Sequence, residues 1–253
     1  MIVVFMGQKK YAEAEQLLVE FLTPDFVATP ESARAVAVRG NYLARRGRWK
    51  EAAADFQLVV KYRPHSHQYY HMLAPVLAEV RDHAAYQKLC REILKEFSGT
   101  TDPYVADQMA KDCLIMSGAG IDMEVVDRMA QTAVNATGES ALTYFRCCKA
   151  LTQYRLGRFE SAIDWARKSF DGPQDIYAQI EAYPILAMAY ARLNQDDEAK
   201  AALAKGTELL RRDLPPRGSD DLGKDWQGWV FGHALMDEAA SLIRPEQNKP
   251  PGD

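Results

Sequence analysis

Long apolar segments and a surplus of basic charge are both missing from this sequence. Its longest apolar start, MIVVFM, is six residues, whereas a membrane-spanning helix needs about 20 apolar residues and a signal peptide needs a basic start. The 31 Lys and Arg residues face 35 Asp and Glu residues, which gives a net charge of −4. General nucleic-acid and membrane-surface binders are strongly basic. We therefore expect a cytoplasmic protein with neither a nucleic-acid nor a membrane partner.

Cysteine motifs and catalytic motifs are also missing. The four cysteines have no CxxC or zinc-type spacing, and in a chain of 253 residues they indicate reduced, largely buried thiols of a cytosolic protein. The vicinal pair Cys147 and Cys148 points to different helix faces, so we expect one of them in the core. Neither a nucleophile elbow nor an HExxH motif occurs. The sequence predicts a protein that is not an enzyme and has no cofactor or metal.

What the sequence does contain is a repeated helix pair, clearest in RRGRWKEAAADFQLVVKYRP, residues 45–64. Gly47 can adopt the positive φ that ends a first helix, and Pro64 stops the second one. Gly40 has no side chain, which allows the second helix to approach its backbone. The seam between the two helices is predicted to contain Trp49, Ala52 and Phe56.

The same pattern returns further along the chain. YRLGRFESAIDWA places a turn glycine at Gly157, and LAMAYARLNQDDEAKAAL has Asn194 at that position, where Asn tolerates the left-handed conformation. Tyr86 replaces the small residue of the second copy and is expected to widen that pair. Pro75 is expected to kink its helix, and Pro184 to start or kink its own.

This recurrence resembles the tetratricopeptide repeat (TPR), a 34-residue helix–turn–helix unit. The resemblance implies an all-α, right-handed helical solenoid of antiparallel helix pairs with a capping C-terminal helix. We expect a half repeat at 1–23 and a loop at 212–224, then the capping helix at 225–243 and a disordered tail at 244–253. The full units are predicted at 33–66, 67–100, 103–136, 143–172 and 180–211.

Two segments resemble a narrower group of proteins. TTDPYVADQMAKDCLIMSG (100–118) and DWQGWVFGHALMDEAASLI (225–243), together with YRLGRFESAIDWARKS, resemble the C-terminal TPR arrays of large bacterial serine/threonine protein kinases. The resemblance covers about residues 33–243. It implies a partner-recruiting scaffold and a chain that is part of a larger, kinase-containing protein. No kinase motif occurs, so kinase activity is not implied.

The concave groove is the predicted binding surface, because in TPR arrays the first helix of each pair lines it. The groove positions hold tyrosines and arginines, a mix that is common at protein interfaces. The predicted groove residues are Arg34, Asn41, Arg45, His71, Tyr104, Lys111, Tyr144, Tyr154, Arg155 and Arg192. Their basic balance predicts an acidic or carboxylate-ended peptide. The alternative is that they form ordinary solvated helix faces.

Three other patterns are weaker. Asn41 matches the asparagine of a carboxylate clamp, but Ala37 stands where that clamp has a lysine, so a clamp is not predicted. A histidine group and a basic run are better explained as protonation-sensitive surface and as a charged turn than as a metal or a phosphate site. The histidines are His65, His67, His71 and His83, and the basic run is Arg45, Arg46, Arg48 and Lys50.

Three functions follow, in order of preference. The first is a non-enzymatic protein–protein interaction module that binds a peptide or protein segment in the concave groove. The second is a structural spacer that associates through its ends, as a homodimer through MIVVFMG or through the helix that contains Trp226 and Trp229. The third is a cryptic enzyme without a known motif.

Overall fold

The protein consists of helices joined by short connections, and no strand occurs in the described residues, which are 2–136, 141–172 and 175–243 of the computed structural model. The tail at 244–253 that the sequence predicts to be disordered lies outside them. None of the described helices is both long enough and apolar enough to cross a membrane. The helices are α1 (Ile2–Gly7), α2 (Tyr11–Phe21), α3 (Pro24–Val27), α4 (Ala33–Arg45), α5 (Trp49–Tyr62), α6 (His67–Val80), α7 (His83–Phe97), α8 (Pro103–Asp112), α9 (Met123–Val134), α10 (Leu142–Arg155), α11 (Phe159–Lys168), α12 (Ile176–Arg192), α13 (Asp196–Asp213) and α14 (Trp226–Ile243), with a 3₁₀ turn at Pro30–Ser32.

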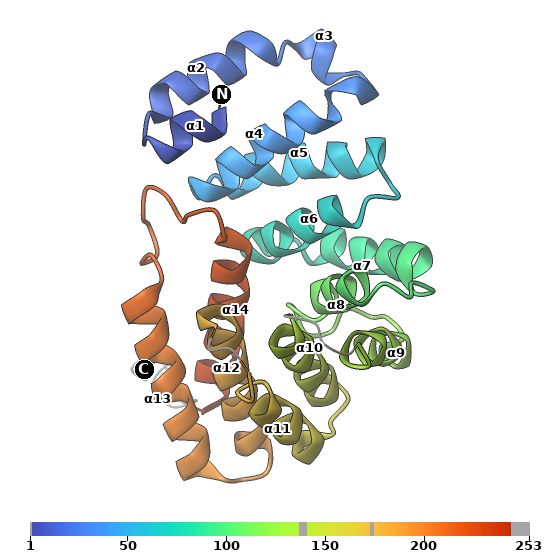
Figure 1. Cartoon of the computed structure of the whole chain (residues 1–253), viewed down its shortest axis with the longest axis vertical. Helices are drawn as coiled ribbons and strands as arrows, with labels where there is room; N and C mark the ends of the chain where they lie inside the picture. Colours follow the sequence, from blue (N-terminus) through green and yellow to red (C-terminus); the bar gives the residue numbers. More distant parts are fainter. Residues whose placement is uncertain (1, 137–140, 173–174, 244–253) are drawn as a thin grey trace, which may run out of the picture.

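Successive helices pack as pairs, and the pairs stack into a curved array (Figure 1). The first helices of the five full pairs begin at Ala33, His67, Pro103, Leu142 and Ile176, at intervals of about 34 residues or slightly more. Each pair also contacts the next one, so a continuous core runs through the stack. The predicted all-α helical solenoid is confirmed.

The turn residues behave as their chemistry requires. Gly47 and Asn194 have φ values of 68° and 58°, which is the left-handed region predicted for them. A Cβ on Gly40 would lie 2.8 Å from Cε1 of Phe56, so the close approach of α5 to this backbone depends on glycine. The turns after α4 and after α12, and the seam between α4 and α5, are therefore set by local sequence.

Two prolines, Pro75 and Pro184, lie inside helices. Pro75 is in α6, and Pro184 is in α12, where both side chains are buried. Helix α12 already begins at Ile176, because Asp175 accepts hydrogen bonds from the backbone N–H groups of Tyr177 and Ala178. The expectation that Pro184 starts this helix is therefore wrong.

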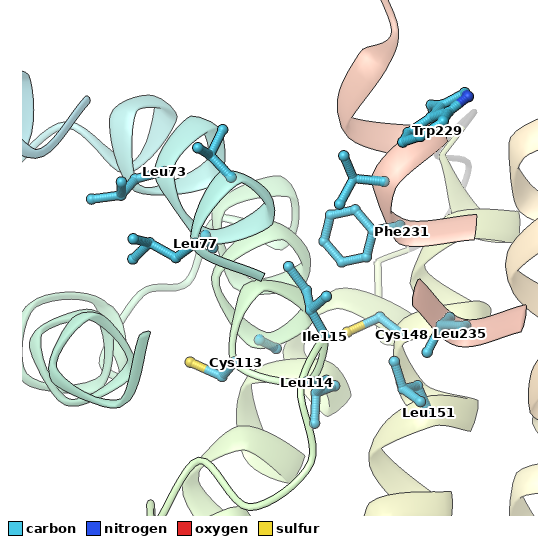
Figure 2. Packing of buried hydrophobic residues seen from close by; sticks show 14 of the residues in the cluster. Leu73, Leu77, Cys113, Leu114, Ile115, Cys148, Leu151, Trp229, Phe231 and Leu235 are labelled. Atoms are coloured by element: carbon cyan, nitrogen blue, oxygen red, sulfur yellow. The ribbon is translucent and has the colours of Figure 1, made fainter. Parts of the chain in front are cut away.

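Helix α14 packs on α12 and α13, as a cap of the last pair would, and it also reaches α6 on the inner side of the curve (Figure 1). Its side chains Phe231 and Leu235 join a core that extends to Leu73 and Leu77 of α6 (Figure 2). It thus fills much of the concave side.

All four cysteines are buried. Of the vicinal pair, Cys148 lies in the main core, as expected for one of the two, and Cys147 is buried in a separate small cluster. Cys147 packs on Ala178 of α12, and the Cys148 thiol faces the backbone carbonyl of Asp107 in α8.

Replacing Gly232 with Ala should destabilise the fold, whereas the same change at Gly7 should not. A Cβ at Gly232 would lie 2.3 Å from Cγ2 of Ile180, and nothing lies within 4 Å of one at Gly7. Overpacking costs about 1–3 kcal/mol, while the helix propensity of Ala returns about 1 kcal/mol. Urea denaturation should give a lower unfolding free energy for Gly232→Ala only. Equal effects at both sites would show that α14 does not pack closely on α12.

Candidate binding site on the concave face

The C-terminal segment, residues 214–243, is held by side chains that the sequence predicts to bind a partner. Arg45 at the end of α4 donates from Nε and one terminal nitrogen to the two carboxylate oxygens of Asp221, at 2.9 and 2.5 Å. Asn41 accepts a hydrogen bond of 2.7 Å from the Trp226 indole. Arg155 at the end of α10 pairs with both carboxylate oxygens of Glu238. The predicted groove therefore has an occupant, and it is part of the same chain.

Asp221 is the most heavily bonded residue of this contact. Besides Arg45, its carboxylate accepts hydrogen bonds from the Tyr11 hydroxyl at 2.9 Å and from the Gly223 N–H at 2.8 Å. Burial alone would raise the pKa of Asp221, but these donors lower it. One carboxylate thus ties α2, α4 and the segment before α14 together.

Aromatic rings complete the contact. Trp49, predicted to fill the seam of its own pair, instead lies against both Trp226 and Trp229, with ring centroids 6.0 and 6.2 Å away. The Trp226 ring also stacks on Phe56, and the Trp229 indole donates to the Pro215 carbonyl at 2.7 Å. Each buried indole N–H therefore has a partner, as buried tryptophans require.

A pocket of about 310 Å³ lies beside this segment, between α6, α8, α10, α12 and the start of α14. Side chains from these five helices meet there, although they are far apart in sequence. The pocket is lined by His71, Tyr104, Asp107, Gln108, Lys111, Ala141, Tyr144, Phe145, Tyr177, Glu181, Asp225, Gln227, Gly228 and Phe231.

Lys111 is the central cation of the pocket. Its Nζ lies 3.0 Å from Glu181 and 3.9 Å from Asp107, and 5.1 Å from the centre of the Tyr144 ring. Burial alone would lower the pKa of Lys111, but the two carboxylates raise it well above its ordinary value. Burial raises the pKa of both Asp107 and Glu181. The lysine charge is thus neutralised by this chain.

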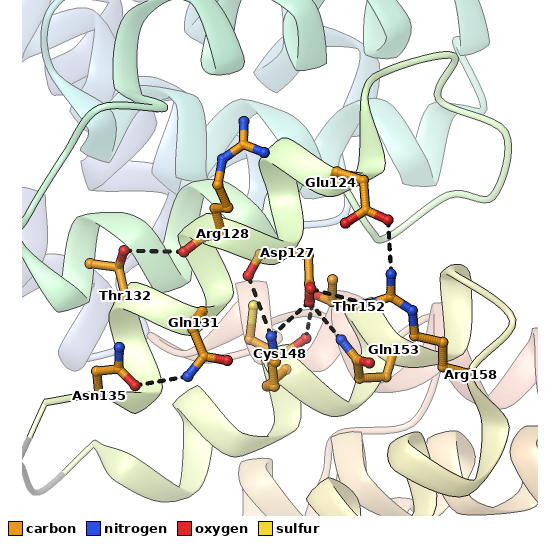
Figure 3. Close-up of polar contacts among 11 residues, drawn as sticks. Glu124, Asp127, Arg128, Gln131, Thr132, Asn135, Cys148, Thr152, Gln153 and Arg158 are labelled. Atoms are coloured by element: carbon orange, nitrogen blue, oxygen red, sulfur yellow. Dashed lines mark hydrogen bonds and ion pairs between the residues drawn. The ribbon is translucent and has the colours of Figure 1, made fainter.

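Two acceptors in the pocket have no partner. Oδ1 of Asp107 and Oε1 of Gln108 are buried and make no hydrogen bond with any described residue. The contrast with Asp127 is informative, because one oxygen of that carboxylate accepts from Lys149 at 2.7 Å and from Gln153 at 2.6 Å, and the other from Arg158 (Figure 3). Buried acceptors are normally satisfied in this way, and an orphaned one calls for an explanation.

His71 lines the pocket and is hydrogen-bonded to Asp112 at the end of α8. Its Nδ1 lies 2.9 Å from Oδ1 of Asp112, whose backbone carbonyl accepts a 2.6 Å hydrogen bond from Tyr86. Burial works against the charged imidazole, but the Asp112 carboxylate outweighs it and raises the pKa of His71. Tyr86, the residue predicted to widen its pair, therefore links α7 to the end of α8.

Three predicted groove residues lie elsewhere. Arg34 and Arg192 are exposed, at the start of α4 and at the end of α12. Tyr154 is buried and packs on Phe159, with ring centroids 5.7 Å apart, so its side chain belongs to the core of its own pair.

The residues that the sequence did not predict for this site come from the C-terminal segment. Asp225, Gln227 and Phe231 line the pocket because α14 turns into the concave side. The sequence signal for this close packing is the pair Gly228 and Gly232. Glycine weakens a helix, and its presence at two positions of α14 indicates that another element approaches the helix backbone closely. A Cβ at Gly228 would lie 2.5 Å from the Tyr177 ring.

Neither the histidine group nor the basic run forms a separate site. No group of three His, Cys, Asp or Glu side chains able to hold a metal exists within the part of the chain that the structure describes. His65 pairs with Glu96, while Arg48 pairs with Glu15 and Glu51. These charges join neighbouring helices of the array.

Comparison with known proteins gives little. No protein-family model matches the chain, and no curated protein matches it. The chain is similar to a solved structure described as the crystal structure of MamA protein, with 14% identity and a TM-score of 0.43 over 74% of this chain and 99% of that one. A second, MamA MSR-1 C2, has 17% identity and a TM-score of 0.44 over 72% and 97%. The fold assignment rests on the helix pairs described above.

Arg155 and Glu238 should be coupled in a double-mutant cycle. Their side chains are 9% and 29% exposed, and the contact is bidentate, so we expect a coupling energy of about 1–3 kcal/mol from the unfolding of Arg155→Met, Glu238→Gln and the double variant. The pair Arg217 and Asp237 also holds α14 but is 48% and 66% exposed, and should give less than about 1 kcal/mol. Equal couplings would contradict the role assigned to Arg155.

Replacing His71 with Gln should lower stability more at acidic than at alkaline pH. A histidine whose pKa is raised in the folded state stabilises the fold fully below the unfolded value of 6.5, and this contribution is lost as pH rises through the folded pKa. Urea denaturation of both proteins at about pH 5.5 and about pH 8.5 measures the difference. Because other groups titrate in both proteins, only the gap between their unfolding free energies reports on His71. A gap that does not narrow at the higher pH would contradict its pairing with Asp112.

Proposed function

We propose that this protein is a non-enzymatic protein-interaction scaffold whose concave side binds a segment of another protein. The observation that carries the proposal is the binding of residues 214–243 in cis. Asn41, Arg45 and Arg155 hold this segment by hydrogen bonds and ion pairs, which is how a groove holds an amphipathic helix from a partner. A surface that already recognises one helix is suited to recognising a second segment beside it.

The occupant also bears on the charge of the partner. The two groove arginines take the acidic side chains Asp221 and Glu238, which supports the prediction that they select acidic groups. Because both arginines are paired within the chain, an acidic partner would have to displace residues 214–243 to reach them. The pocket beside α14 needs no such displacement and is the more accessible part of the groove.

The buried cysteine thiols support the non-enzymatic part of the proposal. Burial raises the pKa of the Cys147 thiol to about 12, and that of Cys148 and Cys113 well above the ordinary value. A thiol must be deprotonated to attack a substrate, so the raised pKa of these three thiols works against a role as nucleophiles at neutral pH.

A more specific proposal is that the protein is the scaffold tail of a bacterial signalling kinase. It rests on the resemblance of residues 100–118 and 225–243 to the C-terminal arrays of such kinases. The comparisons add nothing to it. Within this proposal, α14 and its groove would recruit partners to the kinase.

The second candidate is association through the ends, and exposed apolar side chains favour it. Val4, Val19 and Phe21 on α1 and α2 are 56%, 73% and 64% exposed. These three exposed apolar side chains belong to the N-terminal end of the array, where a second copy of the chain could cover them.

Panning a random-peptide library against the full chain tests the proposal. We expect enriched peptides whose binding weakens by about tenfold or more in Tyr104→Ala, because exposed aromatic residues at an interface commonly carry that much energy. Phe21→Ala is the matched control, since it removes an exposed aromatic ring at the N-terminal end of the array. Binding should be unchanged in this control.

Two outcomes would contradict the scaffold proposal. One is that no peptide is enriched. The other is that binding depends on Phe21 and not on Tyr104, in which case sedimentation of the full chain as a dimer would favour association through the ends.

A further inference from the structure

We propose that the pocket between α6, α8, α10, α12 and α14 binds a primary ammonium or guanidinium group, supplied by a basic side chain or by the amino terminus of a partner segment. This rests on the proposed scaffold function and names the group that the concave side recognises. It also reverses the sign expected from the sequence, which predicted an acidic ligand for the groove as a whole.

The charges that line the pocket favour a cation. Asp107, Glu181 and Asp225 provide three carboxylates, against Lys111 and His71. Lys111 is already shared between Glu181 and Asp107, and the His71 imidazole is paired with Asp112 behind the wall. An incoming carboxylate would therefore find both cations already paired and would meet a net negative charge, because three carboxylates face the single charge of Lys111, and this is costly in a partly buried site.

The unpartnered acceptors specify the kind of cation. The Asp107 side chain is 8% exposed, and its Oδ1 has no hydrogen-bond partner, as is also true of Oε1 of Gln108. A buried acceptor without a donor is costly, and a ligand with N–H groups removes that cost. Primary ammonium and guanidinium groups provide several N–H donors with a positive charge, whereas a quaternary ammonium provides none.

The size and the walls fit one side chain. A volume of about 310 Å³ lies at the lower end of small-ligand pockets, and it would accept a single long side chain rather than a large cofactor. The rings of Tyr104, Tyr144 and Phe231 offer apolar and cation–π contacts for the alkyl stem and the charge. Lys111 itself lies over two of these rings, at 5.1 Å from Tyr144 and 5.9 Å from Phe231.

The test measures binding of small cations to the full chain at constant ionic strength, by NMR chemical-shift changes. Butylammonium and methylguanidinium should bind and should shift signals of the pocket residues. Tetramethylammonium and butyrate, which lack N–H donors or have the opposite charge, should bind at least about tenfold more weakly. If tetramethylammonium binds as tightly as butylammonium, or if no amine binds, the proposal is overturned.

Two substitutions locate the site. Asp107→Asn keeps the shape of the side chain but removes its charge, and should weaken butylammonium binding about tenfold or more. Asp213→Asn makes the same change at an exposed residue at the end of α13 and should leave binding unchanged. Gln108→Leu removes the second acceptor without changing charge, so it tests the site even where Asp107→Asn does not fold. Unchanged binding in a folded Asp107→Asn chain would overturn the assignment.

Two short peptides distinguish the sources of the ammonium group. One has an internal lysine and an acetylated amino terminus, and the other has a free amino terminus and no lysine. Tighter binding of the first assigns the pocket to a side chain, and tighter binding of the second to a chain terminus. Failure of every amine, with library peptides still bound through Tyr104, would overturn this inference and leave the scaffold function standing.

Discussion

The close contact between α14 and α12 is the constraint on which the candidate binding surface depends. Gly228 and Gly232 have no side chains, so Tyr177 and Ile180 approach the α14 backbone directly. The helix can therefore lie inside the curve of the array, where it buries Trp226, Phe231 and other apolar side chains. A solenoid normally presents an open concave side. In this protein that side is largely occupied by its own C-terminal helix, and what a partner can reach is decided by how far α14 extends.

Electrostatics divides the concave side into two regions with different tasks. In the first, Arg45 and Arg155 are paired with carboxylates of the C-terminal segment and hold it in place. In the second, Lys111 is enclosed by carboxylates and serves to make their burial tolerable. A count of arginines and lysines along the groove does not show which of these charges a partner could reach, because the chain itself pairs several of them.

The architecture could be predicted from sequence because its determinants are local. Gly40 specifies a close approach of α4 and α5, and Gly47 and Asn194 specify left-handed turns, each within its own helix pair. The structure shows the expected feature at each of these residues. The binding surface could not be predicted in the same way. The Arg45–Asp221 and Asn41–Trp226 contacts join residues far apart along the chain, so no periodic pattern contains them. Tyr154 shows a related limit, since its helical register alone predicts a place in the groove, whereas its ring lies in the core.

The partly satisfied pocket is more informative about function than the satisfied contacts around it. The Asp127 network between α9, α10 and α11 gives each carboxylate oxygen a donor, and such an arrangement is complete without a ligand (Figure 3). The Asp107 side chain is more buried, at 8% exposed against 17% for Asp127, yet it keeps one oxygen without a donor. Apolar residues of similar size in place of Asp107 and its partners would avoid this cost, because replacing a buried polar group together with its partners is often nearly neutral for stability. Asp107 lines a pocket, and under the proposed binding of an N–H donor the unsatisfied oxygen would gain the hydrogen bond that the folded chain does not supply.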